Sequence, residues 1–370
     1  MNAPAFSLSK RVRPTPFTPR VEEAGCKAYT CYNHMRLPTV FNSFEADYWH
    51  LLEHVQLWDV SAERQVEFKG PDAAKLIQMM TPRDLSKAKI GQCFYAPLVD
   101  ETGGMINDPI ILKLADDHFW ASVADSDVVL WGKGLAAGKG LNVTVQEPDV
   151  SPFAIQGPKA EDLVAKVLGE EIRTIRFFRF AEIEFQGQKM YMARSGWSKQ
   201  GGFEIYLNDS ALGLDLWDTF WEAGQEFNVG PGCPNLIERI EGGLFSYGND
   251  MGYEHNPYEA GLERYAKINP DVDFLGKSAL EKALAKGISR KMRGVKIEGD
   301  DYPPCMTDWD MSGPDGQFAG AISSAAFSPR LKCGVAFAMV QKDFWGTGTK
   351  VMVHTPEGDR EGTVTDIPFL

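Results

Sequence analysis

The sequence predicts an α+β fold of two or three domains, and three observations support this prediction. The chain has 370 residues, more than one compact core usually holds. A strand, a Gly-Pro turn and an amphipathic helix follow one another at residues 64–80, and the pattern returns at residues 153–168, which suggests two related α+β units. From about residue 276 the chain shows one helix and then short alternating strands.

The N-terminal elements are predicted as follows. Residues 1–40 are rich in Pro, Arg and aromatic side chains and have little periodicity, which predicts irregular but packed structure. Apolar side chains recur at helical spacing over residues 44–59 after Ser43, so we expect one helix there. Within residues 64–80 we expect a strand and then a helix whose N-cap is Asp72.

The rest of the chain alternates predicted strands and helices. A turn at residues 101–104 lies among the first strands, and Gln186-Gly187 predicts a hairpin within residues 181–196. We expect helices at residues 211–227 and 277–287. Strands are predicted at residues 93–100, 108–114, 118–124, 294–299, 334–340, 350–354 and 362–367. The last four of them predict a small antiparallel barrel or roll.

The net charge and the cysteine content indicate which partners and which cellular compartment to expect. The chain has 38 Lys and Arg against 51 Asp and Glu, and this net charge of -13 offers no long-range attraction to nucleic acid. The six cysteines form no C-x-x-C pair, which favours free thiols in a reducing compartment. Neither a run of 18 apolar residues nor the apolar core of a signal peptide is present. We therefore expect a cytoplasmic protein that binds neither nucleic acid nor a membrane.

Short catalytic and metal-binding motifs are weak in this chain. His50, Glu53 and His54 spell the H-x-x-E-H pattern of some zinc enzymes, but no third ligand is evident, so we expect ordinary histidines on a helix and no metal. The loop that begins at Gly196 has phosphate-loop spacing, yet Gly202 stands where the lysine would be. A dinucleotide fingerprint and a nucleophile elbow are also missing.

Polar and aromatic residues are mixed in three turn-rich segments, residues 95–109, 194–206 and 235–251. From composition alone they predict either surface turns or a ligand pocket. In this order they resemble the tetrahydrofolate-dependent aminomethyltransferase family, which includes the glycine-cleavage T-protein. The motifs that carry the resemblance are GGMINDP, RSGWSKQGGFE, RIEGGLFSYGND, IQGP and FLGKSAL.

The resemblance implies a three-domain ring with tetrahydrofolate in its central channel. The expected domains are a discontinuous folate-binding α+β domain at residues 1–56 and 148–275, a second α+β domain at 57–147 and an antiparallel barrel or roll at 276–370. Further segments resemble a branch of the family that transfers one methyl group from a sulfonium compound to N5 of tetrahydrofolate. They are RVRPTPF, YNHMRLPTVF, AERQV, SGWSKQGGFEIY and CPNLIERIEGG.

The resemblance also implies folate-site residues. Glu204 would accept two hydrogen bonds from the pterin ring, with Tyr95 as a further folate-binding residue. Asp108 would lie near the reacting nitrogen and be the catalytic residue, because a carboxylate can offset the developing cation or take its proton. The alternative for Asp108 is a turn aspartate that caps backbone N–H groups.

A sulfonium substrate is best held by aromatic faces, since a carboxylate at sulfur would stabilise the charged ground state more than the transition state. The candidate aromatic residues are Tyr32, Phe178, Trp197 and Tyr206, and core packing is their alternative role. Lys199 is the candidate counter-charge for a substrate carboxylate, and a solvated surface lysine is its alternative role.

Asn235 departs from the family pattern, because it stands where the T-protein has an arginine that can meet the glutamate tail of folate. The alternative functions are an aminomethyltransferase acting on a lipoyl carrier protein, a demethylase of a methylated amine or aryl ether, and a folate-binding scaffold without chemistry. Carrier proteins are acidic as a rule, so the net charge of -13 disfavours the first. We expect a small-molecule substrate, tetrahydrofolate as methyl acceptor, and a homodimer as the candidate assembly.

Overall fold

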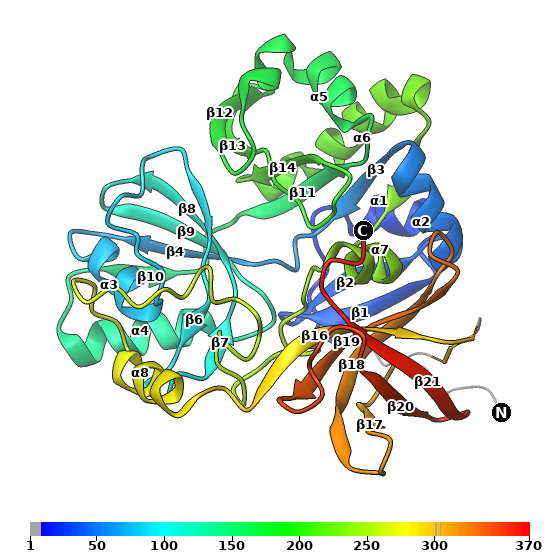
Figure 1. Cartoon of the computed structure of the whole chain (residues 1–370). Helices are drawn as coiled ribbons and strands as arrows, with labels where there is room; N and C mark the ends of the chain where they lie inside the picture. The colour runs from blue at the N-terminus through cyan, green and yellow to red at the C-terminus, as the bar shows by residue number, and fades with distance from the viewer. Residues whose placement is uncertain (1–8, 300–301, 304) are drawn as a thin grey trace. The chain divides into compact units, whose positions relative to one another are not determined.

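The computed structural model describes residues 9–299, 302–303 and 305–370. Both helices and sheets occur along the chain, so the predicted α+β class is confirmed (Figure 1). The chain forms two compact units. Unit 1 comprises Met1–Val66, Glu147–Gly196 and Gln200–Pro234, and unit 2 comprises Glu67–Gln146, Trp197–Lys199 and Asn235–Leu370.

Unit 1 is built on a six-stranded sheet. Its neighbouring strands are antiparallel except β15, which runs parallel to β3. The predicted hairpin about Gln186-Gly187 is confirmed as β12 and β13. In spatial order the strands are β12 (Phe180–Phe185), β13 (Gln188–Ala193), β14 (Gly202–Leu207), β11 (Ser151–Gln156), β3 (Val55–Asp59) and β15 (Val229–Gly232).

The two faces of this sheet differ in chemistry. Alternation places Phe153 and Ile155 of β11 in the main apolar core, on the face that α5 (Ala160–Leu168) and α6 (Gly213–Gly224) cover in Figure 1. The same alternation turns Gln156 and, on β14, Glu204 to the opposite face. Unit 1 therefore has a polar sheet face that carries two of the predicted site residues, Glu204 and Tyr206.

The N-terminal part of unit 1 is more regular than predicted. It forms α1 (Thr18–Glu23) and the hairpin of β1 (Ala28–Tyr32) and β2 (Met35–Val40), so the expectation of irregular structure is wrong for these residues. The expectation that this region is packed is confirmed by Phe17, which is fully buried.

The helix predicted for residues 44–59 is confirmed for residues 44–53 and wrong for the residues that follow. α2 (Phe44–Glu53) begins after Ser43, whose side chain accepts a hydrogen bond from the backbone N–H of Ala46, but the helix ends at Glu53. The following residues form β3, and all five of them are buried between β11 and β15. Sheet pairing and burial outweigh the local helical spacing there.

Unit 2 contains a second sheet and the C-terminal barrel. Two helices, α3 (Ala73–Met80) and α4 (Val128–Lys139), accompany the sheet, and β6 (Leu98–Val99) pairs with β7 (Met105–Asn107) beside the predicted turn. Asp72 is the N-cap residue of α3, as predicted, but its side chain makes no capping hydrogen bond and accepts instead from the backbone N–H of Asn142 (2.7 Å). The sheet order is β10 (Thr144–Gln146), β4 (Gln65–Lys69), β9 (His118–Ser122), β8 (Ile110–Ala115) and β5 (Cys93–Tyr95).

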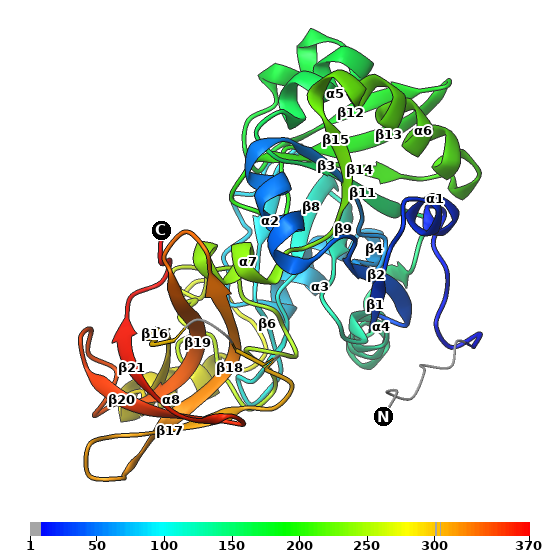
Figure 2. The ribbon, with the colours of Figure 1, turned by 90° about the vertical axis from the view of Figure 1, so that its right-hand side faces the viewer.

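The predicted C-terminal antiparallel barrel is confirmed as six strands that close on themselves (Figure 2). Small and β-branched side chains such as Ala336, Val340 and Val353 fill its interior. α8 (Lys277–Lys286) precedes the barrel, and α7 (Leu236–Gly242) contacts β18 and β19. The strand order is β16 (Arg290–Ile297), β19 (Cys333–Gln341), β18 (Phe318–Ser328), β17 (Trp309–Ser312), β20 (Lys350–Thr355) and β21 (Gly358–Thr365).

The predicted repeat of a strand, a Gly-Pro turn and a helix is confirmed. Strand β4 of the unit 2 sheet is followed by α3, and strand β11 of the unit 1 sheet is followed by α5. The predicted three-domain boundaries stay a prediction; residues 235–275, expected in the folate-binding domain, belong to unit 2.

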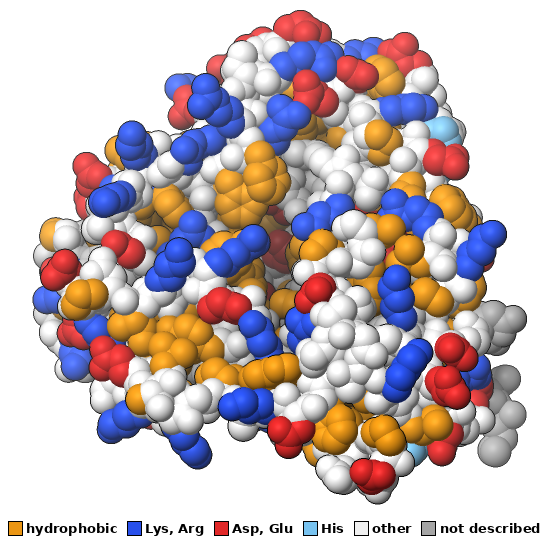
Figure 3. All heavy atoms as spheres, viewed as in Figure 1, with side chains coloured by type: hydrophobic (Ala, Val, Ile, Leu, Met, Phe, Trp, Pro, Cys, Tyr) orange, Lys and Arg blue, Asp and Glu red, His pale blue; other side chains and the backbone are white. Residues whose placement is uncertain are grey.

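All six cysteines are free thiols. Among the residues that the structure describes, no helix is long and apolar enough to cross a membrane. Figure 3 shows basic and acidic side chains interspersed over the face it presents.

Candidate active site

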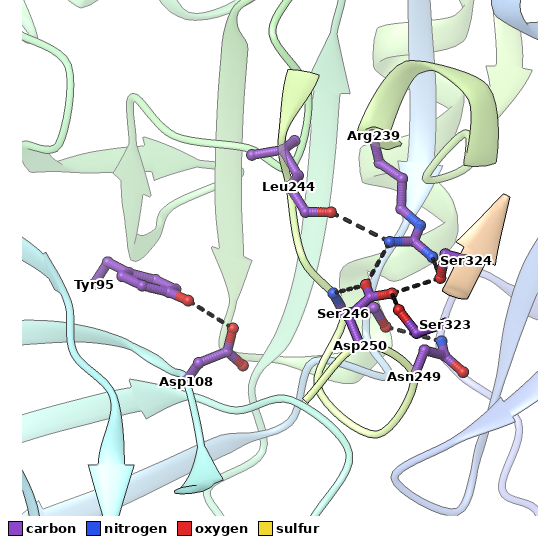
Figure 4. Close-up of polar contacts among 9 residues, drawn as sticks. All are labelled: Tyr95, Asp108, Arg239, Leu244, Ser246, Asn249, Asp250, Ser323 and Ser324. Atoms are coloured by element: carbon purple, nitrogen blue, oxygen red, sulfur yellow. Dashed lines mark hydrogen bonds and ion pairs between the residues drawn. The ribbon is translucent and has the colours of Figure 1, made fainter. Parts of the chain in front are cut away.

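Tyr95 and Asp108 form a hydrogen-bonded pair in unit 2. Tyr95 ends β5, Asp108 follows β7, and the Tyr95 hydroxyl donates to Asp108 Oδ2 at 2.9 Å (Figure 4). Asn107 fixes the turn, because its Oδ1 accepts from the backbone N–H groups of Asp108 and Ala124, each at 3.0 Å. The Tyr95 ring is held edge-on by Tyr265, with 4.8 Å between the ring centroids. The two predicted folate-site residues of unit 2 therefore lie together.

The surroundings of this pair shift the proton affinity of both groups. Burial raises the pKa of Asp108 to about 7, Asp250 adds a smaller repulsion, and the Tyr95 hydrogen bond opposes the rise. Burial and the neighbouring Asp108 carboxylate raise the pKa of Tyr95 well above its ordinary value, so Tyr95 stays protonated and donates. Asp108 is thus a carboxylate that can exchange a proton near neutral pH.

A buried ion pair lies in the same unit (Figure 4). Arg239 of α7 donates to Asp250 Oδ2 at 2.8 Å and to Ser324 Oγ of β18 at 2.7 Å. Asp250 also accepts from the Ser246 backbone N–H and the Ser323 hydroxyl, each at 2.8 Å, and from the Ser324 hydroxyl at 2.6 Å. These bonds satisfy a charge pair that burial would otherwise make costly. The network joins α7 and β18 close to Asp108.

The predicted substrate loop approaches α7. The Arg239 guanidinium lies 5.7 Å from the centre of the Trp197 ring, and the Lys199 backbone N–H donates to Glu238 Oε1 at 2.7 Å. The Lys199 side chain is exposed, and no ion pair is formed by it in the described part of the chain. Trp197 and Lys199 are therefore held in unit 2 with Asp108, and the Lys199 ammonium group can meet an anion.

Glu204 lies on the polar sheet face of unit 1 and is 7% exposed. The Ser195 hydroxyl donates to its Oε2, and Gln156 on the neighbouring strand donates to the Ser195 carbonyl at 3.1 Å. No described residue donates to Glu204 Oε1. Burial raises the pKa of Glu204, and the Ser195 hydrogen bond opposes that rise. A buried carboxylate with one oxygen left open fits a ligand that presents N–H groups.

The other predicted aromatic residues also belong to unit 1. Tyr206 is two positions from Glu204 on β14, but it is only 1% exposed, so it offers a ligand almost no surface in this structure. Phe178 lies in the turn before β12 and is partly exposed, with its ring against Phe177. Tyr32 is half-buried at the end of β1.

Asn235, the predicted departure from the family pattern, is the N-cap of α7. Its Oδ1 accepts from the backbone N–H groups of Ile237 (3.0 Å) and Glu238 (3.2 Å). The asparagine thus starts the helix that carries Arg239. No role was predicted for Asn107, Arg239 or Asp250, although the last two begin and end the motif RIEGGLFSYGND.

The H-x-x-E-H pattern lies at the end of α2. His54 is its C-cap residue, Lys159 Nζ lies 3.0 Å from His54 Nδ1, and His50 contacts Gln56. In the described ranges, no group of three or more His, Cys, Asp or Glu side chains is arranged to hold a metal ion.

Comparison with known proteins places this chain in one family. The chain matches the model of the GCVT N-terminal domain over residues 17–270 and the model of the glycine cleavage T-protein C-terminal barrel domain over residues 290–370. The chain belongs to the glycine cleavage T-protein, or aminomethyltransferase, family, and the resemblance inferred from its motifs is confirmed.

Individual relatives refine this assignment. The chain is 51% identical over 358 residues, 97% of each chain, to "Dimethylsulfoniopropionate demethylase DmdA" of Ruegeria pomeroyi. It is 29% identical to an aminomethyltransferase of Thermoanaerobacter pseudethanolicus over 86% of each chain. The crystal structure of glycine cleavage system aminomethyltransferase T from Bartonella henselae gives a TM-score of 0.87 at 25% identity and covers 97% of this chain and 98% of that chain.

Proposed function

We propose that this protein is a tetrahydrofolate-dependent methyltransferase that demethylates dimethylsulfoniopropionate. The products are methylmercaptopropionate and 5-methyltetrahydrofolate. The observation that carries the proposal is the 51% identity over 97% of the chain to a demethylase of this substrate, against 29% to an aminomethyltransferase. The Tyr95–Asp108 pair supports it, because methyl transfer to an amine releases a proton that a base must accept.

The reaction is a displacement at the methyl carbon. The lone pair of N5 on tetrahydrofolate forms the new bond to carbon while the carbon–sulfur bond breaks, and its electrons stay on sulfur as a neutral thioether. The N5 cation formed in this way then loses its proton. Because the sulfonium is already an activated methyl donor, the protein mainly has to align sulfur, carbon and nitrogen.

Asp108 is the proposed proton acceptor. Its pKa of about 7 means that a large share of the carboxyl is ionised at neutral pH while its basicity exceeds that of an ordinary aspartate. Tyr95 orients Oδ2 through its hydroxyl. Glu204 is the proposed partner of the pterin ring, with the open Oε1 accepting a ring or amino N–H.

For the sulfonium, Trp197 is the aromatic residue that the geometry supports best, since it shares unit 2 with Asp108. Arg239 lies over the Trp197 ring, so the substrate cation has to use the ring's other face. Lys199 is the proposed partner of the substrate carboxylate. Roles for Tyr32, Phe178 and Tyr206 in substrate binding stay predictions.

The products formed from tetrahydrofolate distinguish the candidate functions. Incubation with tetrahydrofolate and dimethylsulfoniopropionate should yield 5-methyltetrahydrofolate and methylmercaptopropionate in equal amounts, measured by liquid chromatography. Formation of 5,10-methylenetetrahydrofolate from an aminomethyl-lipoyl carrier would instead support the aminomethyltransferase. Folate binding without any product would support the scaffold.

A cytoplasmic location and a homodimer stay predictions for this protein. The small-molecule substrates are compatible with a cytoplasmic location, because their conversion needs no membrane. Cell fractionation would test the location, and light scattering of the purified chain would test the assembly.

A further inference from the structure

Three polar side chains of the C-terminal barrel form a hydrogen-bonded chain that methyl transfer does not use. Ser312 ends β17, His354 belongs to β20 and Asp359 belongs to β21. Ser312 Oγ lies 2.9 Å from His354 Nε2, and His354 Nδ1 lies 2.7 Å from Asp359 Oδ1. This order of hydroxyl, imidazole and carboxylate is that of the Ser-His-Asp triad of hydrolases, which is recognised by geometry and not by sequence position.

Strand pairing holds the three side chains in place. β17, β20 and β21 are neighbours in the barrel, and His354 stands directly opposite Asp359 in the ladder of β20 and β21 (Figure 1). Directly opposed residues project from the same face of an antiparallel pair. Val351 and Val353 of β20 point into the barrel core, so alternation turns His354 to the outer face. The arrangement is therefore built on paired strands and is open to solvent.

Asp359 fixes the tautomer of the imidazole. A carboxylate can only accept a hydrogen bond, so the proton of the neutral ring lies on His354 Nδ1, which donates to Asp359 Oδ1. Nε2 is then an acceptor, and the Ser312 hydroxyl donates to it. Ser312 thus has a base in position to take its proton, which is what a serine nucleophile needs.

The residues beside Ser312 indicate which acyl groups the site accepts. Its cross-strand partners are Phe318 on β18 and Met352 on β20. Phe318 is 55% exposed and Met352 is partly exposed, so both offer apolar surface. Asp310 and Glu361 are exposed on the neighbouring strand positions and disfavour an anionic group. The site therefore fits a neutral ester of an apolar acid.

Exposure limits the reactivity that the site requires of its substrate. The side chain of His354 is 41% exposed, so water surrounds the reacting atoms. Stabilisation of an oxyanion is strongest where water is excluded, and amides depend on it most. An activated aryl ester depends on it less, because its leaving group is already a stable anion. Activated esters are therefore the substrate class that this site suits.

We propose that Ser312, His354 and Asp359 form a second catalytic site, which hydrolyses activated, neutral carboxylic esters. Ser312 Oγ bonds to the acyl carbon while its proton passes to His354 Nε2. The ester carbon–oxygen bond breaks, its electrons leave on the phenolate, and the phenolate takes the proton from Nε2.

Water completes the cycle. It gives one proton to His354 Nε2, and its oxygen bonds to the acyl carbon. The Ser312 oxygen then leaves with the proton from Nε2, which releases the carboxylic acid and restores the serine. Asp359 is a positioning residue, since it acts only through His354.

The test uses p-nitrophenyl acetate, whose phenolate product is followed by its absorbance. Ser312→Ala and His354→Gln should each lower kcat about a hundredfold, the lower end of what a positioned general base contributes. Asp359→Asn should lower kcat and leave KM unchanged. The matched control is Ser289→Ala, which removes an exposed serine elsewhere in unit 2 and should change neither constant. Unaltered melting temperatures of the four variants would show that each one is folded.

Two further measurements locate the acyl group. Peptide mass spectrometry after acid quenching should find the acetyl group on Ser312. The butyrate ester should react faster than the acetate, and Phe318→Ala should remove that difference. An unchanged rate in Ser312→Ala would mean that the imidazole acts without the serine and would overturn the triad. Acetylation of lysines alone, or hydrolysis no faster than in buffer, would overturn the site.

Discussion

At the scale of single residues, burial and one hydrogen bond set the pH range over which Asp108, the proposed base, can accept a proton. Its pKa of about 7 leaves it largely protonated at pH 6 and largely ionised at pH 8. A proton acceptor acts only when ionised, so turnover should rise with pH through about 7.

We predict that Asp108→Asn lowers kcat about a hundredfold or more, with little change in either KM, because an amide keeps the shape but accepts no proton. The rise of the remaining activity around pH 7 should also disappear. Steady-state kinetics from pH 5.5 to 9 test both. A higher KM at unchanged kcat would assign Asp108 to binding.

A substitution of Tyr95 tests whether its hydrogen bond helps to set the pKa of Asp108. We predict that Tyr95→Phe moves the rise in turnover to higher pH by about one unit, because the variant loses the hydrogen bond to the ionised carboxylate while burial remains. The pH–rate profile measures this shift, with Tyr191→Phe, on β13 of unit 1, as the control. A rise at unchanged pH would mean that the hydroxyl does not control Asp108.

Glu204 makes the corresponding prediction for binding. Glu204→Gln should weaken tetrahydrofolate roughly ten- to a hundredfold, since a charge-assisted bond is replaced by a neutral one, while the Ser195 partner is kept. Titration by tryptophan fluorescence gives the Kd, and an unaltered melting temperature shows that the fold is intact. An unchanged Kd would place the pterin elsewhere.

At the scale of elements, the network of Arg239 and Asp250 explains how α7 is held, although it has only seven residues. Such a short helix is marginal by itself. The ion pair and Ser324 fix it to β18, and the Asn235 cap starts it. The sequence contains both ends of the ion pair within one motif, but Ser324 lies 74 residues beyond Asp250, and nothing local to either segment indicates that they meet.

We predict that Asp250→Asn lowers the free energy of unfolding by about 3–5 kcal/mol, because it leaves the buried Arg239 charge without its partner. Ser323→Ala removes only one neutral donor to the same carboxylate and should cost about 1 kcal/mol. Urea unfolding of both variants measures the difference. If both variants lost a similar and small free energy of unfolding, the ion pair would contribute little to stability.

At the scale of the whole molecule, strand and helix patterns predicted the α+β class and the C-terminal barrel, and motif resemblance predicted the family, because family motifs cover nearly the whole chain. It could not predict which site residues share a compact unit: Asp108 and Trp197 lie in unit 2, Glu204 in unit 1. That distribution follows from long-range pairing, such as β3 entering the sheet in place of the predicted helix. Local periodicity carries no information about such pairing.

A last prediction concerns the activity of the whole enzyme. Glycine betaine carries a quaternary ammonium in place of the sulfonium, and we expect it to compete weakly without being demethylated. If Trp197 holds the substrate cation as proposed, its ring face should attract either cation, since the attraction depends on diffuse charge. A tertiary amine is a far poorer leaving group than a thioether, and alignment alone does not offset that difference. Assays with each donor, followed by competition, test this prediction. Methyl transfer from glycine betaine at a rate comparable to that from the sulfonium would contradict a mechanism in which the enzyme works mainly by aligning the reacting atoms.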